Sequence, residues 1–586
     1  MKSVLNKTND KSNISQTFKL HAKTKTTNSK DIANHFCDFF TNVGPTYANA
    51  IPKSKNTFQS YMKNRSSQTL FLSPTDANEI KKTIYSSLKS KHSCGHDNVS
   101  PSFLKQISHE ISYPISILIN KSIESGEVPD VMKIAKVVPI YKSKDKEEFS
   151  NYRPISLLPT LSKILEKIIH KRLYFYFQTN TLFYGSQFGF RKQHSTIHAV
   201  TEFVTHTIEA LENKTATLSV FLDLSKAFDT IDHNIMLKKL EFYGIRGIAL
   251  NWFESYLTGR KQFVQFNNEK SILEDIICSV PQGSVLGPLL FIIYTNDIPN
   301  CIKSSCVIVF ADDTTIYASG SNMTTLYNTM KIELESLTDW FCANKLSLNV
   351  SKTNYMVFGN HNITANQNNI LSIGNTHIQR KSVAKFLGVL IDDQLNWFDH
   401  IKHVKSKMSS SLYCMNSAKN ILTKNELIIL YYSLLYPYLD YGIVLWGSAG
   451  RNYINRLATL QKKAVRTIVR ANYNDHTAPI YKALNLIKID DMYKLQLGKF
   501  MYQVNNNNLP LPIMSLFTSN AEVHDHFPRQ RNNLHFRHRR TAHANKSVTY
   551  MGPTVWQDIP QIIKLKPSLK SFSNAYKKYL VANDSN

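Results

Sequence analysis

The stretch CVIVFADDTTIYAS (residues 306–319) is the part of the sequence on which the predicted fold depends most. Two runs rich in β-branched and aromatic residues, 306–311 and 314–319, flank Asp312 and Asp313, which predicts a hairpin with both acids at its turn. Acids at a turn usually do no more than accept hydrogen bonds from nearby backbone N–H groups. The pair therefore needs a further carboxylate on a neighbouring strand before it indicates a site.

Such a carboxylate ends another apolar run, LSVFLDL (218–224). In a strand, Val220 and Leu222 share one face while Phe221 and Asp223 share the other, so Asp223 would end the strand where it reaches solvent. Joining a nucleotide to a primer requires an activated hydroxyl, a neutralised triphosphate and an in-line arrangement, and two divalent cations held by carboxylates provide all three. Mg²⁺ prefers hard oxygen ligands and keeps several waters, so a few carboxylates suffice.

Further strings with distinctive residues surround these acids in a fixed order. They are SCGHDNVSPSFLK (93–105), NYRPISLLPTLSKILEKII (151–169), QFGFRKQHST (187–196), FLDLSKAFDTIDH (221–233), VPQGSVLGPLLFIIYTNDI (280–298), VFADDTTIY (309–317), LSLNVSKTNYMVF (346–358), KFLGVLIDDQLNW (385–397), YPYLDYGIVLWG (436–447) and LQKKAVRTI (460–468). Together they resemble the successive motifs of reverse transcriptases from non-long-terminal-repeat retrotransposons, particularly those of the jockey type. The resemblance covers roughly residues 75 to 470.

The resemblance implies an RNA-directed DNA polymerase with an acidic metal site. Asp223 and Asp312 would bind both of two Mg²⁺ ions, for which Mn²⁺ could substitute, and the backbone carbonyl of Leu224 would be a further ligand. Asp313 would complete the catalytic site less directly. Because adjacent strand residues point in opposite directions, Asp313 could instead orient the turn.

The same resemblance implies residues that contact the nucleotide. Phe228 would lie under the incoming sugar and leave no room for a 2′ hydroxyl, although it could also be a core phenylalanine at the start of a helix. Gln282 would lie near the nucleotide and template, and Gly283 would permit a close approach of the backbone.

Several cationic residues are implied to contact phosphate groups. Arg153 and Lys142 would neutralise the triphosphate, since arginine suits bidentate phosphate contacts, although the KSKDKEE segment at Lys142 could be an ordinary solvated loop. Lys352 would approach the pyrophosphate leaving group. Arg191 would contact the template backbone, whereas His194 is expected to pack or to form hydrogen bonds.

Composition agrees with a polyanionic partner. The formal net charge is +27, which favours nucleic acid or an acidic surface, and the expected partners are an RNA template, a DNA primer and deoxynucleoside triphosphates. The seven scattered cysteines lack zinc spacing, which predicts reduced thiols in an intracellular protein of the nucleus or cytoplasm. No signal peptide is evident, and the apolar stretch 427–446 is expected to be a buried helix followed by a turn. We therefore expect no membrane partner, and the oligomeric state stays open.

The expected fold class is α+β, with helices over 233–243, 324–344 and 423–435. The resemblance implies a right-hand polymerase with fingers, a palm containing a small antiparallel sheet, and a helical thumb. Asp232 is expected to cap a helix, and Asp297 and Asp392 to have ordinary turn or cap roles. The expected divisions are a polar linker or remnant (1–74), fingers and palm (75–400, divided near 190), the thumb (401–500) and a basic C-terminal region (501–586).

Other interpretations stay open at this point. The chain could bind nucleic acid without catalysis, or be another enzyme of the same fold, such as an intron-encoded maturase or an RNA-directed RNA polymerase. Phe228 and the Phe-Ala-Asp-Asp string disfavour an RNA product. About 70 residues precede the resemblance, so we expect no upstream endonuclease domain. The basic stretch 523–540 is expected to be either a backbone-binding arm or a solvated loop.

Overall fold

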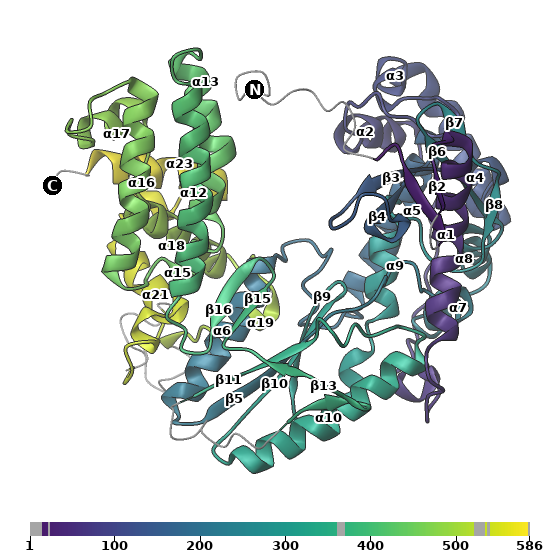
Figure 1. Cartoon of the computed structure of the whole chain (residues 1–586). Helices are drawn as coiled ribbons and strands as arrows, with labels where there is room; N and C mark the ends of the chain where they lie inside the picture. Colours follow the sequence, from purple (N-terminus) through teal and green to yellow (C-terminus); the bar gives the residue numbers. More distant parts are fainter. Residues whose placement is uncertain (1–14, 22–23, 360–369, 521–533, 536–538, 584–586) are drawn as a thin grey trace.

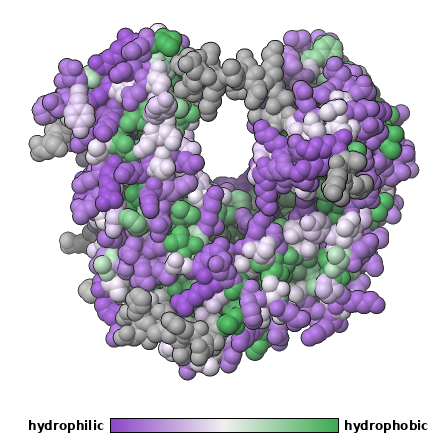
Figure 2. Space-filling model, in the orientation of Figure 1, coloured by the Kyte–Doolittle hydropathy of each residue, from purple (hydrophilic) through white to green (hydrophobic). Residues whose placement is uncertain are grey.

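In a computed structural model of the protein, residues 15–21, 24–359, 370–520, 534–535 and 539–583 are described. Two lobes rise from a central sheet (Figure 1). Figure 2 shows an opening between the lobes, with mostly hydrophilic residues along both rims in this view. We call the lobe that contains a second sheet the mixed lobe, and the other the helical lobe.

The central sheet has the strand order β14-β11-β5-β10-β9. Its strands are β5 (Ala216–Leu222), β9 (Cys306–Phe310), β10 (Asp313–Gly320), β11 (Asn354–Phe358) and β14 (Gln379–Arg380). All neighbours are antiparallel except β11 and β14. The predicted hairpin is confirmed, but only Asp312 lies in its turn with Ala311, because Asp313 already pairs with Phe310 as the first residue of β10.

Strand β5 is buried on both faces. Val220 and Leu222 belong to the same core as helix α10 (Met323–Ala343), whereas the Phe221 ring lies 5.7 Å from that of Phe203 in α6 (Thr196–Glu212). The two-residue alternation predicted for this strand is therefore confirmed. A strand covered on both faces needs apolar residues at nearly every position, which is why β5 contains so few polar residues before Asp223.

The second sheet brings together distant parts of the sequence. It contains β3 (Ile134–Tyr141), β4 (Tyr152–Leu157), β6 (Arg260–Phe266), β7 (Glu269–Lys270) and β8 (Glu274–Ile276). Because β6 pairs parallel to β3, with Ile134 opposite Lys261, the chain returns to the mixed lobe after β5. The expected division near residue 190 therefore does not follow the lobes.

The N-terminal segment differs from its expected role as a polar linker. Residues Ser29–Asn49 form helix α1, in which Phe36 and Cys37 are fully buried. They belong to the same core as Val137 of β3 and Val264 of β6. The apolar side chains of α1 thus form a buried face, because the second sheet provides an apolar surface for them. Residues 1–14 lie outside the described residues.

The other helices of the mixed lobe and its junction with the sheet are α2 (Ala77–Ser87), α3 (Pro101–Gln106), α4 (Ser108–Ser125), α5 (Thr160–Thr179), α7 (His233–Phe242), α8 (Ile248–Leu257) and α9 (Gly287–Tyr294). As predicted, Asp232 caps α7 by accepting a 2.9 Å hydrogen bond from the backbone N–H of Ile235. The side chain of Asp297 does not cap a helix. It lies buried, 2.6 Å from the ammonium group of Lys239, a partner too distant in sequence to be evident from local pattern.

The helical lobe contains the predicted helix over 423–435 as α13 (Lys424–Leu430) followed by a π-helical turn. Its other helices are α12 (Phe398–Ala418), α14 (Tyr436–Asp440), α15 (Ile443–Trp446), α16 (Arg451–Val469), α17 (Ala478–Leu484), α18 (Ile489–Asn505), α19 (Leu511–Met514), α21 (Val548–Asp558), α22 (Gln561–Lys564) and α23 (Leu569–Ala582). Helix α18 contacts α21 and α23, so part of the C-terminal region shares its core with this lobe. Among the described helices, none has the length and apolar character needed to cross a bilayer.

Candidate active site

The three aspartates predicted from the sequence lie at one end of the central sheet. Leu222 of β5 pairs with Thr314 of β10, so the residues that flank this pair, Asp223 and Asp313, lie at the same end of the ladder. Asp312 lies in the adjacent turn, and both Asp312 and Asp313 are exposed, with Asp223 half-buried. The structure therefore brings the three side chains to one edge of the sheet.

Their negative charges act on one another. Asp313 reaches the surface but is surrounded largely by protein; this partial loss of solvent, together with the charges of Asp312 and Asp223, raises its pKa to about 6. The pKa of Asp312 is also raised, first by the same loss of solvent and then by Asp223, while Arg153 and Lys142 oppose the shift. Carboxylates whose negative charge is only partly neutralised by nearby cations favour the approach of a further cation.

The turn that carries Asp312 is held by a loop of the QFGFRKQHST segment. Ala311 adopts a left-handed backbone conformation with φ of 57°. The buried side-chain carbonyl of Gln187 accepts hydrogen bonds from the backbone N–H groups of Gly189 and Ala311, at 2.8 and 3.3 Å. A Cβ atom on Gly189 would lie 2.4 Å from the Ala311 nitrogen, so this position has no room for a side chain. Neither supporting residue was singled out from the sequence.

Cationic side chains lie close to the acids. Burial lowers the pKa of Lys142, and the charges of Arg153, Lys352 and Lys226 lower it further, while Asp223 opposes them. The Lys352 ammonium group lies 3.0 Å from a carboxylate oxygen of Asp223. The structure therefore brings together the three cations predicted from the sequence and adds Lys226, which was not predicted. Such a group suits a polyanionic ligand.

The VPQGSVLGP loop packs between the two sheets. The Gln282 amide nitrogen donates a 2.7 Å hydrogen bond to Asp229, and its backbone carbonyl accepts one from Ser156 of β4. Gly283 has φ of 125°, and a Cβ atom there would lie 2.6 Å from the Ser156 carbonyl oxygen, as expected for a close backbone approach. Burial raises the pKa of Asp229, and the hydrogen bond from Gln282 opposes that shift.

The same loop is anchored on its other side by Glu166 of α5. This fully buried carboxylate accepts hydrogen bonds from the backbone N–H groups of Val285 and Leu286, and from the Tyr256 hydroxyl at 3.2 Å. Burial raises the pKa of Glu166, while the charge of Arg260 opposes the shift. Glu166 and Asp229 are thus two supports of the loop that the sequence pattern did not reveal.

Phe228 is half-buried and does not begin a helix. Its ring is stacked on that of Phe291 in α9, with 4.6 Å between centroids, and meets the Phe190 ring edge-on at 6.4 Å. Leu224 forms an isolated bridge with Leu348, and the hydrogen bonds on either side of it use Asp223 and Ser225. In a bridge of this kind the peptide groups of Leu224 itself point away from the partner strand.

Two other predicted residues serve the local structure. Arg191 donates hydrogen bonds to the backbone carbonyls of Tyr184 and Gln187 and lies over the Phe183 ring, so its guanidinium is engaged within the loop and not presented to a template. The ring Nδ1 of His194 donates a 2.7 Å hydrogen bond to the Lys192 carbonyl, in agreement with the expected packing or hydrogen-bonding role. The basic stretch 523–540 lies almost entirely outside the described residues.

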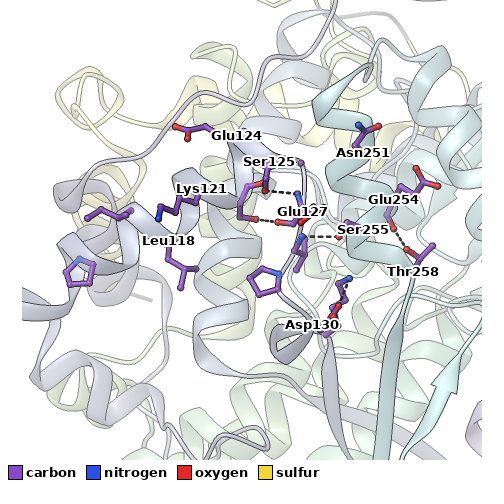
Figure 3. A pocket seen from close by; sticks show the side chains of 17 residues that line it. Leu118, Lys121, Glu124, Ser125, Glu127, Asp130, Asn251, Glu254, Ser255 and Thr258 are labelled. Carbon is purple, nitrogen blue, oxygen red and sulfur yellow. Dashed lines mark hydrogen bonds and ion pairs between the residues drawn. The ribbon is translucent and has the colours of Figure 1, made fainter.

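No three histidine, cysteine, aspartate or glutamate side chains in the described parts of the chain are grouped so that they could hold a metal ion by themselves. A hollow of about 1350 Å³ between α4 and α8 contains none of the residues predicted for the site (Figure 3). Two serines of the hollow serve the neighbouring turn. The Ser255 hydroxyl accepts a hydrogen bond from the backbone N–H of Val128, and the Ser125 hydroxyl accepts one from that of Glu127.

Comparison with known proteins shows what the part of the chain that carries this site is similar to. The family model described as reverse transcriptase (RNA-dependent DNA polymerase) matches residues 142–391, the range that contains the acids, the cations and the loop described above. A reverse transcriptase domain therefore occupies this part of the chain.

Individual relatives extend the similarity beyond that domain. The chain is 27% identical, over 76% of its length, to the RNA-directed DNA polymerase from mobile element jockey of Drosophila melanogaster, and 28% identical, over 74%, to the probable RNA-directed DNA polymerase from transposon BS of the same species. The chain is thus homologous to the polymerases of jockey and other non-LTR retrotransposons. It spans about half the length of these two relatives, 50% and 49%.

Proposed function

We propose that this chain is an RNA-directed DNA polymerase that extends a DNA primer along an RNA template with deoxynucleoside triphosphates. The observation that supports this most directly is the meeting of Asp223 and Asp312 with Lys142, Arg153 and Lys352 inside a reverse transcriptase domain. Acids beside cations are what a reaction on a metal-bound triphosphate requires.

In this proposal the molecule is a right hand. The central sheet is the palm, the mixed lobe is the fingers and the helical lobe is the thumb, with the template and primer held in the opening between the lobes (Figure 1). The fingers would then combine residues before 190 with the returning segment 260–276. The hydrophilic rims seen in Figure 2 suit a nucleic-acid backbone.

The residues present fit divalent metal ions by their chemistry. Asp223, Asp312 and the carbonyl of Leu224 would hold two Mg²⁺ or Mn²⁺ ions, with Asp313 in a less direct role, and phosphate oxygens and water would complete the coordination. The pKa values of Asp312 and Asp313 are raised by loss of solvent and by neighbouring carboxylates, and a divalent cation would stabilise the charged form of such groups. When bound, the metal would supply activation of the 3′ hydroxyl and neutralisation of phosphate charge.

The chain's own side chains would position the nucleotide. Lys142 and Arg153 would bind the triphosphate, and Lys352 would leave Asp223 to approach the leaving pyrophosphate. Phe228, held from behind by Phe291, would exclude a 2′ hydroxyl. Gln282 would support the nascent pair, with its amide oriented by Asp229.

Primer extension on an RNA template tests the proposal. The purified chain should extend the primer, and Asp223→Asn and Asp312→Asn should each abolish extension while affinity for the primer–template is retained. Asp275→Asn is the matched control, because this exposed carboxylate of β8 forms only a weak surface ion pair with Lys261, 3.7 Å away. Extension by all the variants would mean that these carboxylates are not the catalytic ones.

A second function, nucleic-acid binding without polymerisation, is favoured by one observation. The ammonium group of Lys352 lies 3.0 Å from Asp223, so one of the proposed metal ligands is paired with a cation of the chain itself. If that function is correct, the unmodified chain will bind primer–template with an affinity that falls steeply with salt, and will not extend it with either metal.

A further inference from the structure

A second basic site lies at the tip of the helical lobe. Helices α12 and α16 pack side by side in the helical lobe, and α12 runs from its end near the central sheet towards the tip (Figure 1). Since α12 has 21 residues, its C-terminal end lies about 30 Å from the end that adjoins the sheet. The site described here is therefore well separated from Asp223 and Asp312.

At this tip the C-terminal ends of the two helices border a pocket of about 380 Å³. Four of the residues that line it are cationic, namely Lys419, Lys463, Arg466 and Arg470, and no acidic side chain lines it. This volume is within the range of about 300–1,000 Å³ that is usual for small-molecule sites. The pocket is thus large enough for a nucleotide unit and has the charge to attract its phosphate.

Part of this positive charge has a structural explanation. Two helix C-termini meet here, and cations near a helix C-terminus are stabilising. Arg470 donates hydrogen bonds to the backbone carbonyls of Lys419 and Leu422, and Arg466 donates one to that of Asp475. These contacts account for the two arginines.

Backbone hydrogen bonds of this kind do not account for the two lysines of the pocket. Neither Lys419 nor Lys463 forms an ion pair within the part of the chain that the structure describes. Lys463 lies instead over the ring of Tyr473, 5.8 Å from its centroid, and the Arg466 guanidinium lies 6.0 Å from the same centroid. The Tyr473 side chain is 73% exposed, so it offers an aromatic surface next to unpaired positive charge.

We infer that this pocket binds single-stranded nucleic acid, with a base stacked on Tyr473 and its phosphates at Lys419 and Lys463. An exposed ring beside cations is the arrangement by which proteins bind single strands without reading their sequence. A duplex does not fit this arrangement, because its bases are already stacked on one another. The LQKKAVRTI segment, to which the proposed polymerase mechanism gives no role, would thus hold a strand outside the polymerase opening.

The test measures binding at the tip while the opening is filled. The full chain is saturated with a blunt primer–template hybrid, and fluorescent oligouridine of about a dozen nucleotides, a usual site size, is then titrated. Oligothymidine of equal length shows whether the pocket distinguishes RNA from DNA. We expect Tyr473→Ala to weaken binding of the single strand about 5- to 150-fold, the worth of one base–aromatic stack, and Tyr473→Phe to preserve it.

Charge is tested separately from stacking. The double variant Lys419→Gln with Lys463→Gln should reduce the salt slope of the affinity by about 1.4, since each phosphate contact to a single strand contributes about 0.7. For the Tyr473→Ala variant, Tyr413→Ala is the matched control, because Tyr413 is also an exposed tyrosine, lies on α12 and does not line the pocket. Thermal unfolding of each variant confirms that the fold is retained.

Three results would overturn the inference. They are no binding of the single strand to the hybrid-loaded chain, unchanged affinity in Tyr473→Ala, or an unchanged salt slope in the double lysine variant. The outcome does not depend on polymerase activity. A chain that binds at the tip but extends no primer refutes only the proposed function, and one that extends primers but fails these tests refutes only this inference.

Discussion

Replacing Gly189 by alanine should displace the turn that carries Asp312 and leave the proposed triphosphate contacts of Lys142 and Arg153 in place. The added Cβ would lie 2.4 Å from the backbone nitrogen of Ala311, whereas ordinary contact begins at 3.4 Å, so the turn must retreat by about 1 Å. Backbone atoms cannot rotate away as a long side chain can. A displacement of this size at a reacting centre costs about 100-fold in rate, and overpacking lowers the free energy of unfolding by about 1–3 kcal/mol.

The effects of Gly189→Ala on kcat and on KM should distinguish a displaced turn from damage to the rest of the site. Because Lys142 and Arg153 belong to the mixed lobe and do not contact Gly189, we expect kcat for primer extension to fall about 100-fold, with little change in KM for the nucleotide. Single-turnover extension on an RNA template measures the fall in kcat, and the dependence of the extension rate on nucleotide concentration measures KM. Urea unfolding measures the loss of stability.

Gly185→Ala is the control for this prediction. Gly185 belongs to the same loop, but the nearest atom to its added Cβ would be Cγ of Pro512 at 3.7 Å, an ordinary contact. This variant should keep the rate and stability of the unmodified chain. If Gly189→Ala behaves in the same way as Gly185→Ala, the argument that this glycine sets the position of Asp312 is refuted.

Three further predictions concern residues near the same site. Gln187→Ala should lower the free energy of unfolding by about 1–3 kcal/mol for each of the two buried N–H groups, of Gly189 and Ala311, that lose their acceptor, as urea unfolding would show. Burial raises the pKa of Glu202 to about 7, so the unmodified chain should lose stability as pH rises from about 4.5 to 7. Glu202→Gln should remove that loss and be up to about 3 kcal/mol more stable than the unmodified chain at pH 8. Equal pH profiles of the free energy of unfolding would contradict this. Phe228→Val should raise ribonucleotide incorporation relative to deoxynucleotide incorporation, and an unchanged ratio of kcat/KM would remove the assignment of this ring as a sugar gate.

Much of the central sheet could be predicted because its signals are local. The apolar alternation through Val220 and Phe221 fixed which face of β5 meets which core, and the two acids between apolar runs indicated the hairpin turn. Asp223 and Asp312 therefore lie at one edge of the sheet, as the pattern indicated, although their metal-binding role stays a proposal.

The supports of the site could not be predicted in the same way. Glu166 precedes its partner Val285 by 119 residues, and Asp229 precedes Gln282 by 53. A buried polar contact over such a separation leaves no periodic pattern in the sequence, since each partner alone resembles an ordinary helix or turn residue. The sequence motifs show which residues surround the site, but only the packing shows which of them hold the others in place.

Helix α1 is the clearest example, because residues 1–74 were expected to form a polar linker or remnant. Its ring Phe39 lies under the ammonium group of Lys226, 5.8 Å away, and its Thr41 hydroxyl donates a 2.6 Å hydrogen bond to Glu274 of β8. Lys226 is one of the cations grouped around Lys142 near Asp223. The charge that faces the proposed triphosphate is therefore positioned partly by a segment that precedes residue 75, outside the range in which the sequence motifs occur. The geometry of the candidate active site therefore depends on the packing of the whole mixed lobe and sheet, and the motif residues alone do not define it.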